Sequence, residues 1–195
     1  MTTVALFNLF TPMSLSLEPP EILQQKLFCN ARKFSFEINH LRLPNGSTGD
    51  WACVRHPGGA MAVPVLEDGR FVLVKQYRFA LQGRLLEFPA GTVEIEEEPF
   101  VTIQREIQEE TGYKAHRWQP LAEFPLAPGY SDEIIYAYLA QDLERLETPP
   151  AQDEDEDIET VLMTADELET AIRSGESIDA KTICTFFMAR SLLKL

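Results

Sequence analysis

The chain has 195 residues, 45% hydrophobic and 25% charged, the usual balance for a globular protein with a packed core. Its 17 basic and 31 acidic side chains give a net charge of −14 with no basic stripe, which argues against nucleic acid as a partner. No apolar run approaches the ~18 residues of a membrane span, so we expect no membrane association. The odd set of Cys29, Cys53 and Cys184 lacks metal-ligand spacing and predicts buried thiols in a reducing, cytoplasmic compartment.

The N-terminal part divides into an extension and a β-module. Residues 1–21 are mildly apolar and contain no Lys or Arg, which argues against a targeting peptide and predicts a weakly structured extension. Within the predicted module, residues 22–57, polar and apolar residues alternate over 33–43, and a second extended stretch follows at 50–56. Asn45-Gly46 between them favours a hairpin turn. The Pro-Gly-Gly sequence at 57–59 then predicts a joint, with the main domain over residues 58–195.

The main domain begins with two predicted strands and a helix. Residues 60–66 and 71–79 flank Glu-Asp-Gly-Arg, which predicts a second hairpin, and Pro64 places the first of these strands at an edge or a bulge. The helix is predicted to begin at Pro99, after three glutamates, and to end at Gly112.

Further elements alternate along the rest of the chain. Strands are predicted at 121–126 and 134–140, around the loop 127–133, and an acidic loop at 147–157 precedes a strand at 158–163. Thr164 and Glu167 form a capping box for a helix that ends at Gly175. Asp179 caps a last amphipathic helix, whose expected apolar face is Ile183, Phe186, Phe187 and Leu193. Strands and helices are mixed without a βαβ rhythm, so the fold class is α+β or a mixed-sheet sandwich.

The helix after Pro99 carries clustered carboxylates. Glu106 and Glu110 are four residues apart and lie one above the other, and Glu109 lies on the adjoining strip. Oxygen ligands without His or Cys nearby suit a hard cation, Mg²⁺ above all, with Mn²⁺ possible. From the charge alone, a solvated acidic helix is the alternative.

The spacing of these residues distinguishes the two interpretations. The sequence reads Gly91, five residues, Glu97, seven residues, Arg105-Glu106-Ile107, one residue, Glu109-Glu110, one residue and Gly112. This spacing resembles the Nudix box of the Nudix hydrolases at all seven fixed positions, which are the residues named other than Ile107. The resemblance implies a mixed β-sheet sandwiched between helices, with the box forming a loop–helix–loop. It also implies hydrolysis of a nucleoside diphosphate linked to another group.

The resemblance assigns roles within the box. Glu106, Glu110 and the main-chain carbonyl of Ala90 are expected to bind metal, and Glu109 to have a supporting catalytic role or to share in binding the metal. Arg105 is expected to brace the loop through Glu97, although an i,i+4 pair with Glu109 is equally open.

Two positions depart from the usual pattern. Tyr113 replaces the common aliphatic residue at the end of the box, a minor change. Glu96 replaces a glycine that close relatives often carry in the turn before the helix. If that turn requires positive φ, the glutamate costs about 1 kcal/mol.

Four outer motifs resemble the ADP-ribose pyrophosphatase branch of the family. They are Gln-Tyr-Arg at 76–78, Leu-Leu-Glu-Phe-Pro-Ala-Gly at 85–91, Ala-Pro-Gly-Tyr-Ser-Asp-Glu at 127–133 and the acidic run 153–159, and Pro128 stands fifteen residues after Tyr113, as in that branch.

The branch likeness implies further site residues. Arg78 is expected to bind a substrate phosphate, unless it is a solvent-exposed strand-end arginine. Pro128 would line the pocket for the terminal ribose, unless it only forms a turn. Glu87 lies in apolar sequence and needs a partner if buried; it would contact substrate or, indirectly, metal.

The acidic run supplies the remaining assignments. By its position in that branch, Glu154 matches the general base and Glu156 a further metal ligand. The alternative is a flexible solvated loop, the usual role of such a run of acidic residues. Glu133, which we count among the substrate-binding residues, and Glu109 are the next candidates for the base. Trp51 would stack on adenine, or else belong to the core of a dimer.

The likeness as a whole predicts Mg²⁺-dependent hydrolysis of ADP-ribose to AMP and ribose 5-phosphate by a homodimer whose N-terminal module forms the contact. The alternatives are hydrolysis of another small nucleotide sugar, such as ADP-glucose or GDP-mannose, a non-catalytic nucleotide-sensing domain, and an acidic interaction module.

Overall fold

The computed structural model describes residues 15–151 and 157–194. Its strands are β1 (Glu21–Asn30), β2 (Ser35–Arg42), β3 (Thr48–Arg55), β4 (Gly59–Pro64), β5 (Phe71–Arg78), β6 (Gly83–Glu87), β7 (Ala90–Thr92), β8 (Tyr113–Pro125), β9 (Ile134–Arg145) and β10 (Ile158–Met163). The helices are α1 (Pro99–Thr111), α2 (Ala165–Ser174) and α3 (Ala180–Leu193), with a short 3-10 turn at Phe79–Leu81.

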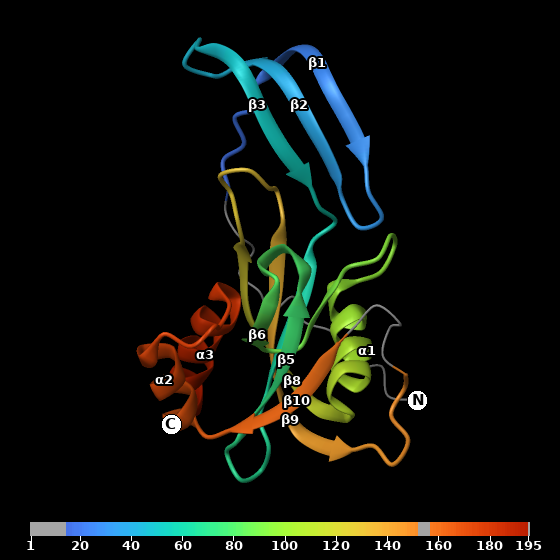
Figure 1. Ribbon diagram of the computed structural model, residues 1–195, viewed down its shortest axis with the longest axis vertical. Coiled ribbons are helices and arrows are strands. Elements are labelled where there is room, and N and C mark those ends of the chain that lie inside the picture. Colours follow the sequence, from blue (N-terminus) through green and yellow to red (C-terminus); the bar gives the residue numbers. More distant parts are fainter. Residues whose placement is uncertain (1–14, 152–156, 195) are drawn as a thin grey trace.

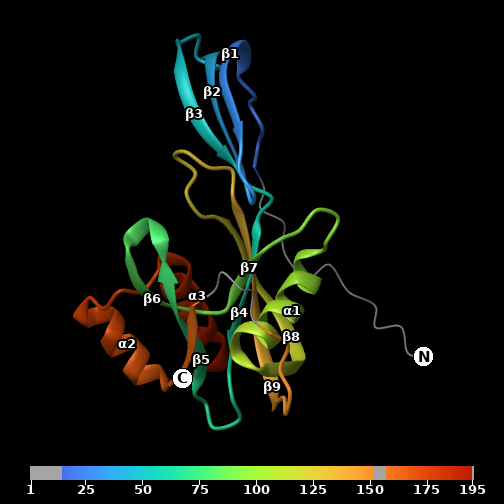
Figure 2. The same cartoon turned by 45° about the vertical axis from the view of Figure 1, so that its right-hand side comes forward.

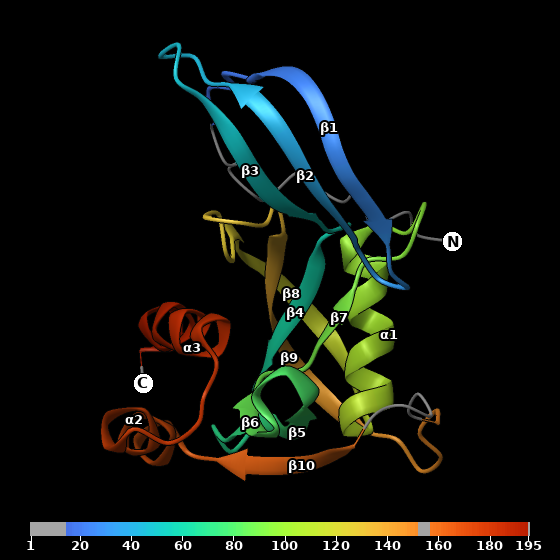
Figure 3. The same cartoon turned by 45° about the horizontal axis from the view of Figure 1, so that its top comes forward.

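Two sheets lie between the helices, with α1 on one side and α2 and α3 on the other (Figures 1 and 3). One sheet has the order β7-β4-β9-β8 and is mixed, because β4 and β9 run parallel while the other neighbours are antiparallel. The second, β10-β5-β6, is antiparallel. The expected α+β fold with a mixed sheet between helices is confirmed.

Strand β4 is buried on both faces, so it divides the core into two clusters. Ala60 and Ala62 point to the α1 side, where Ile103 packs on them. Met61 and Val63 point to the α2 and α3 side. The small alanine side chains leave room for α1 to lie close to the sheet that carries the glycine of the box.

A separate three-stranded sheet, β1-β2-β3, extends away from the helices (Figure 2). The predicted hairpin is confirmed as β2 and β3, and Gly46 takes a φ of 84° in its turn. Strand β1 was not predicted from the alternation of residues. It pairs with β2 through a register interrupted twice, and all ten of its residues are exposed, so no polar–apolar alternation marks it.

The second predicted hairpin is only partly correct. The turn is present, since Leu66 N–H donates to Arg70 O at 2.9 Å, but the flanking residues share a single antiparallel bridge, Val65 to Phe71. Strands β4 and β5 then enter different sheets. Pro64 does not mark an edge strand: β4 lies between β7 and β9, and Pro64 is its last residue, beyond the point where pairing with β7 ends.

The predicted helix boundaries are confirmed by their capping groups. Pro99 is in the first turn of α1, and Gly112 ends it with a φ of 71°. Thr164 and Glu167 form the capping box of α2. The Asp179 side chain accepts from the N–H of Thr182 at the start of α3.

The predicted apolar face of α3 is wrong in part. Phe186 is buried, but Phe187 is 41% exposed. The buried residues of the helix are Lys181, Thr182, Thr185, Phe186 and Ala189. Because apolar residues occur all around this helix, their pattern does not indicate which side packs on the sheet.

The prediction of buried thiols is also wrong. Cys29 lies on the exposed strand β1 and Cys184 on the outer side of α3, and both are exposed free thiols. Cys53 is half-buried, and burial raises the pKa of its thiol.

None of the helices in residues 15–151 and 157–194 has the length and the apolar character needed to span a membrane.

Candidate active site

A cavity of about 660 Å³ opens where β5, β6 and β7 meet α1 and the start of α3. Five of the predicted site residues line it: Arg78, Glu87, Ala90, Glu106 and Glu133. A second hollow of about 790 Å³ between β10 and α2 contains none of them.

The glycine of the box lies directly against a carboxylate of the helix. A Cβ placed on Gly91 would be 2.0 Å from Glu106 Oε1, so no other residue fits there without displacing Glu106. Next to it, the Ala90 N–H donates to Glu110 Oε2 at 3.0 Å. Glu106 and Glu110 are only 8% and 2% exposed. Two nearly buried carboxylates therefore converge on the main chain at residues 90 and 91.

This arrangement fits a divalent cation. Buried carboxylates carry a high desolvation cost unless positive charge is near, and hard cations prefer carboxylate and carbonyl oxygens. Within the described ranges, no three His, Cys, Asp or Glu side chains gather closely enough to hold a metal by themselves. The expected ligand set combines two side chains with the Ala90 carbonyl, and Glu156 lies outside the described residues.

Arg105 is the cation inside the acidic helix. Its Nη1 lies 2.9 Å from both Glu106 Oε1 and Glu109 Oε2, and its Nη2 lies 3.4 Å from Glu97 Oε2. Both pairings left open by the sequence are therefore present. Burial opposes the charge of Arg105, but Glu106 and its other carboxylate partners outweigh it and raise the arginine pKa. Arg105 thus braces the loop against the helix and offsets part of the charge.

The turn before α1 has the positive φ considered for Glu96. Its φ is 66°, and the turn is closed by the N–H of Glu97, which donates to Glu94 O at 3.1 Å.

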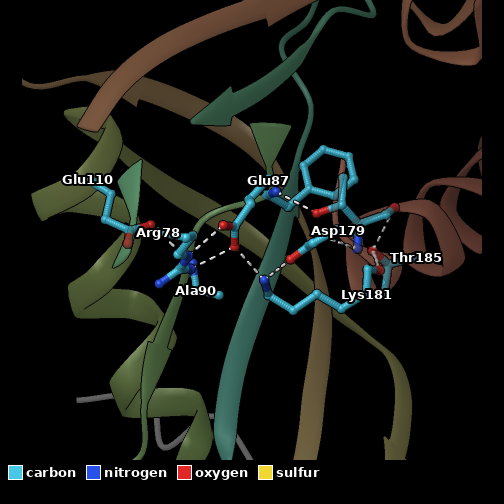
Figure 4. Close-up of polar contacts among 9 residues, drawn as sticks. Arg78, Glu87, Ala90, Glu110, Asp179, Lys181 and Thr185 are labelled. Atoms are coloured by element: carbon cyan, nitrogen blue, oxygen red, sulfur yellow. Dashed lines mark hydrogen bonds and ion pairs between the residues drawn. The ribbon is translucent and has the colours of Figure 1, made fainter. Parts of the chain in front are cut away.

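An ion network lies beside Ala90 in the cavity wall (Figure 4). Arg78 grips Glu87 with two hydrogen bonds, Nε to Oε1 at 2.6 Å and Nη2 to Oε2 at 2.7 Å. Lys181 Nζ donates to Glu87 Oε2 at 2.6 Å and also pairs with Asp179. Glu87 is thus buried with the partners that its burial demands. Burial opposes its ionisation, but the Arg78 hydrogen bonds and the Lys181 charge prevail and lower its pKa to about 2.

The loop 127–133 is attached to the end of β3. Val54 N–H donates to Tyr130 O at 2.8 Å, and His56 N–H donates to Asp132 Oδ1 at 2.9 Å. Glu133 Oε1 then lies 3.6 Å from His56 Nδ1, and both residues line the cavity.

Several predicted residues do not line the cavity in this structure, among them Arg105 and also Glu110, which with Glu109 lines a separate hollow. Pro128 is exposed in a turn of the loop 127–133. Trp51 lies on β3, where its ring covers Gly49: a Cβ placed on Gly49 would be 3.1 Å from the ring. Glu109 is turned toward Arg105. The predictions for Glu154, like that for Glu156, concern residues outside the described part of the chain.

The sequence did not single out Lys181 or His56 as cavity residues. Lys181 follows a helix cap, where a lysine is usually solvated, and only the tertiary contact with Glu87 shows that it is buried. For His56, the only local signal was its place next to the predicted joint.

The fold is a mixed sheet between helices. The carboxylates of α1 lie against a glycine, next to a cavity that contains an arginine. Such a protein is equipped to hold a cation next to an anionic substrate. Residues 55–186 match the NUDIX domain, and the chain belongs to the Nudix family.

Two curated relatives match over most of their length. A "Methanol dehydrogenase activator" of Bacillus methanolicus is 35% identical over 171 residues, 88% of this chain and 92% of the relative. An "ADP-ribose pyrophosphatase" of Bacillus subtilis (strain 168) is 36% identical over 167 residues, 86% of this chain and 90% of the relative. Among solved structures, an "ADP compounds hydrolase" superposes with a TM-score of 0.77 at 24% identity, covering 93% of this chain and 97% of that one, which shows a shared fold.

Proposed function

We propose that the chain hydrolyses the pyrophosphate linkage of ADP-ribose, with Mg²⁺, to AMP and ribose 5-phosphate. The observation that carries the proposal is the convergence of Glu106 and Glu110 on the main chain of Ala90 and Gly91 at the wall of a cavity. The relative named ADP-ribose pyrophosphatase, 36% identical over 86% of this chain, supports the choice of substrate.

The residues in and beside the cavity have different roles. Glu106, Glu110 and the Ala90 carbonyl would hold the cation, which when bound supplies positive charge and lowers the pKa of the attacking water. Arg78, whose side chain is 39% exposed, presents its guanidinium to a substrate phosphate, for which its fork of donors is suited. Arg105 keeps the loop and the helix together, so that the carboxylates hold their positions.

The general base is proposed from the acidic segment. Glu154 would take the proton of the attacking water, and Glu156 would complete the metal ligands. Glu154→Gln should lower kcat by roughly 10²–10⁴ with KM little changed, whereas Glu156→Gln should raise the Mg²⁺ requirement. If neither variant differs from wild type, Glu133 becomes the candidate, because it lines the cavity while Glu109 is held by Arg105.

The N-terminal sheet is the proposed contact surface of a homodimer. Strand β1 is exposed along its whole length, and its exposed residues include Ile22, Leu27 and Phe28. Apolar groups on the outer strand of a sheet favour pairing with another chain. Light scattering should give twice the chain mass, and Phe28→Asp should shift it toward the monomer. A wild-type monomer at assay concentration would refute the dimer.

A cytoplasmic location is part of the same proposal. The thiol of Cys184 is exposed and free, and such a thiol persists in a reducing compartment.

The deciding experiment is AMP release from ADP-ribose with Mg²⁺ and with EDTA, beside ADP-glucose and GDP-mannose as competing substrates. Glu110→Gln should lower kcat at least 10²-fold, because a lost ligand removes several kcal/mol of charge stabilisation. Glu98→Gln is the matched control, since Glu98 is an exposed carboxylate at the N-terminus of the same helix, with no side-chain cap bond. Equal activity in EDTA, or a higher kcat/KM on another nucleotide sugar, would overturn the respective part of the proposal.

A further inference from the structure

The first turn of α3 holds the chain segment that leads into the box. Lys181 Nζ donates to Glu87 Oε2 at 2.6 Å, and Thr182 Oγ1 accepts from the N–H of Phe88 at 2.8 Å. Three residues after Glu87, the N–H of Ala90 is bound by Glu110 of α1. Residues 87–90 are therefore fixed from two sides, by α3 and by α1 (Figure 4).

The charges in this contact form a chain along the cavity wall, which all four of its members line. Asp179 pairs with Lys181, Lys181 with Glu87 and Glu87 with Arg78, so that acids and bases alternate and their sum is zero. The side chains of Lys181 and Glu87 are 10% and 2% exposed, whereas that of Arg78 is 39% exposed. The outermost member of the chain is thus the arginine at the cavity.

The orientation of Arg78 depends on Glu87. Two of the five N–H donors of the guanidinium are bound to the two oxygens of this carboxylate, a geometry that fixes the plane of the group. The same Oε2 atom that accepts from Arg78 also accepts from Lys181. Removing the lysine would take away one of the two donors on Glu87 Oε2 and leave Glu87 beside Asp179 with one cation fewer. The carboxylate is then free to rotate, and the two-bond contact that fixes the plane of Arg78 loosens.

We propose that Lys181 is a positioning residue, which through Glu87 fixes the guanidinium of Arg78 for binding the substrate phosphate. The role of Arg78 toward substrate rests on the function proposed above, whereas the coupling between Lys181 and Arg78 rests on the contacts alone. Lys181 acts without touching the reacting atoms, and its effect on the reaction passes through Arg78.

Kinetics separate this role from simple packing of the helix. Lys181→Met should raise the KM for ADP-ribose about tenfold and change kcat less, and Lys181→Arg, which keeps a charged donor, should restore the KM to within about threefold of wild type. Thr185→Val is the matched control: Thr185 is buried on the same face one turn later, and its hydroxyl donates to main-chain carbonyls of α3. It should lower thermal stability and leave the KM unchanged.

A double-mutant cycle tests whether the effect passes through Arg78. In an Arg78→Ala background, adding Lys181→Met should change the KM less than twofold. Additive effects would mean that Lys181 binds substrate independently, and an unchanged KM in folded Lys181→Met would overturn the proposal. If Lys181→Met does not fold, Lys181→Gln, which keeps a donor without the charge, should raise the KM at least threefold. A wild-type KM in Lys181→Gln would likewise overturn the proposal.

A measurement without substrate distinguishes this inference from the proposed function. The Nε–H of Arg78 donates to Glu87 at 2.6 Å, so its NMR signal, assigned by its loss in Arg78→Lys, should be shifted and slow to exchange in the wild type. Lys181→Met should move this signal and speed its exchange, and Thr185→Val should not. A signal that Lys181→Met leaves unchanged refutes the positioning role. A signal that moves while the wild type fails to hydrolyse ADP-ribose refutes only the proposed substrate.

Discussion

The glutamate at position 96 stores backbone strain that a single substitution should release. Its φ of 66° lies in the left-handed region, at the third position of the turn closed by Glu94 and Glu97. In type II turns this position takes positive φ and favours glycine. A side chain at this position destabilises the folded state by about 1–2 kcal/mol, which Glu96→Gly would remove. Because glycine makes the unfolded chain more flexible, about 0.5–1 kcal/mol of this gain is lost again. Glu96→Gly should therefore raise the free energy of unfolding by about 0.5–1 kcal/mol.

Glu94→Gly is the matched control for this change. Glu94 is an exposed glutamate in the same loop with φ outside the positive region, so the same loss of charge and side chain should destabilise by about 0.5–1 kcal/mol. Urea unfolding in EDTA measures both, and the two variants should differ by about 1–2 kcal/mol, or about 2–8 °C in Tm for a chain of this size. A Glu96→Gly variant no more stable than Glu94→Gly would refute the reasoning.

Three other outcomes follow from the structure. Gly91→Ala should lower kcat at least 10²-fold, because the new methyl group occupies the position of the Glu106 carboxylate. The pKa of Glu87 is about 2 against 4.5 unperturbed, so its charge stabilises the fold fully above pH about 4.5 and progressively less as pH falls toward 2. The wild type should therefore exceed Glu87→Gln in unfolding free energy by about 3 kcal/mol near neutral pH, and the difference should narrow over that acidic range. In thiol titration of the folded protein, Cys184 should react well before Cys53, whose pKa is raised by burial.

Each of these outcomes has a contrary result. Gly129→Ala adds a methyl group with nothing within 4 Å, so equal losses of kcat in Gly129→Ala and Gly91→Ala would remove the steric argument. A constant gap between wild type and Glu87→Gln from pH 5 to pH 2.5 would mean that the carboxyl is not ionised by its neighbours. Equal reaction rates of the two cysteines would contradict the half-buried position of Cys53.

Local chemistry explains what the sequence could predict. Pro99 and Gly112 bound the acidic helix by restrictions on their own backbones, and the capping box at Thr164 satisfies donors within three residues. Spacing along one helix then placed Glu106 and Glu110 together. These features depend on contacts within one turn, so they can be read without the rest of the chain.

Long-range pairing explains where the predictions from sequence were wrong or incomplete. The turn at Asp68-Gly69 suggested a hairpin, yet β4 pairs with the distant β9, because a strand buried on both faces finds its partners across the whole core. Strand β1 lacks the alternation that burial on one face would impose. Lys181 resembles a surface lysine in every local respect, and only Glu87, 94 residues earlier in the chain, makes it an interior one.

The hydrogen bonds between β3 and the loop 127–133 couple the cavity to the N-terminal sheet. Val54 and His56 each hold this loop, so a swing of the sheet about Pro57 would carry Glu133 with it. A fragment beginning at residue 58 would lose these anchors along with the sheet. Transplanting the hydrolase core onto another N-terminal module therefore requires the graft to begin upstream of Val54, so that the hydrogen bonds to the loop 127–133 are kept.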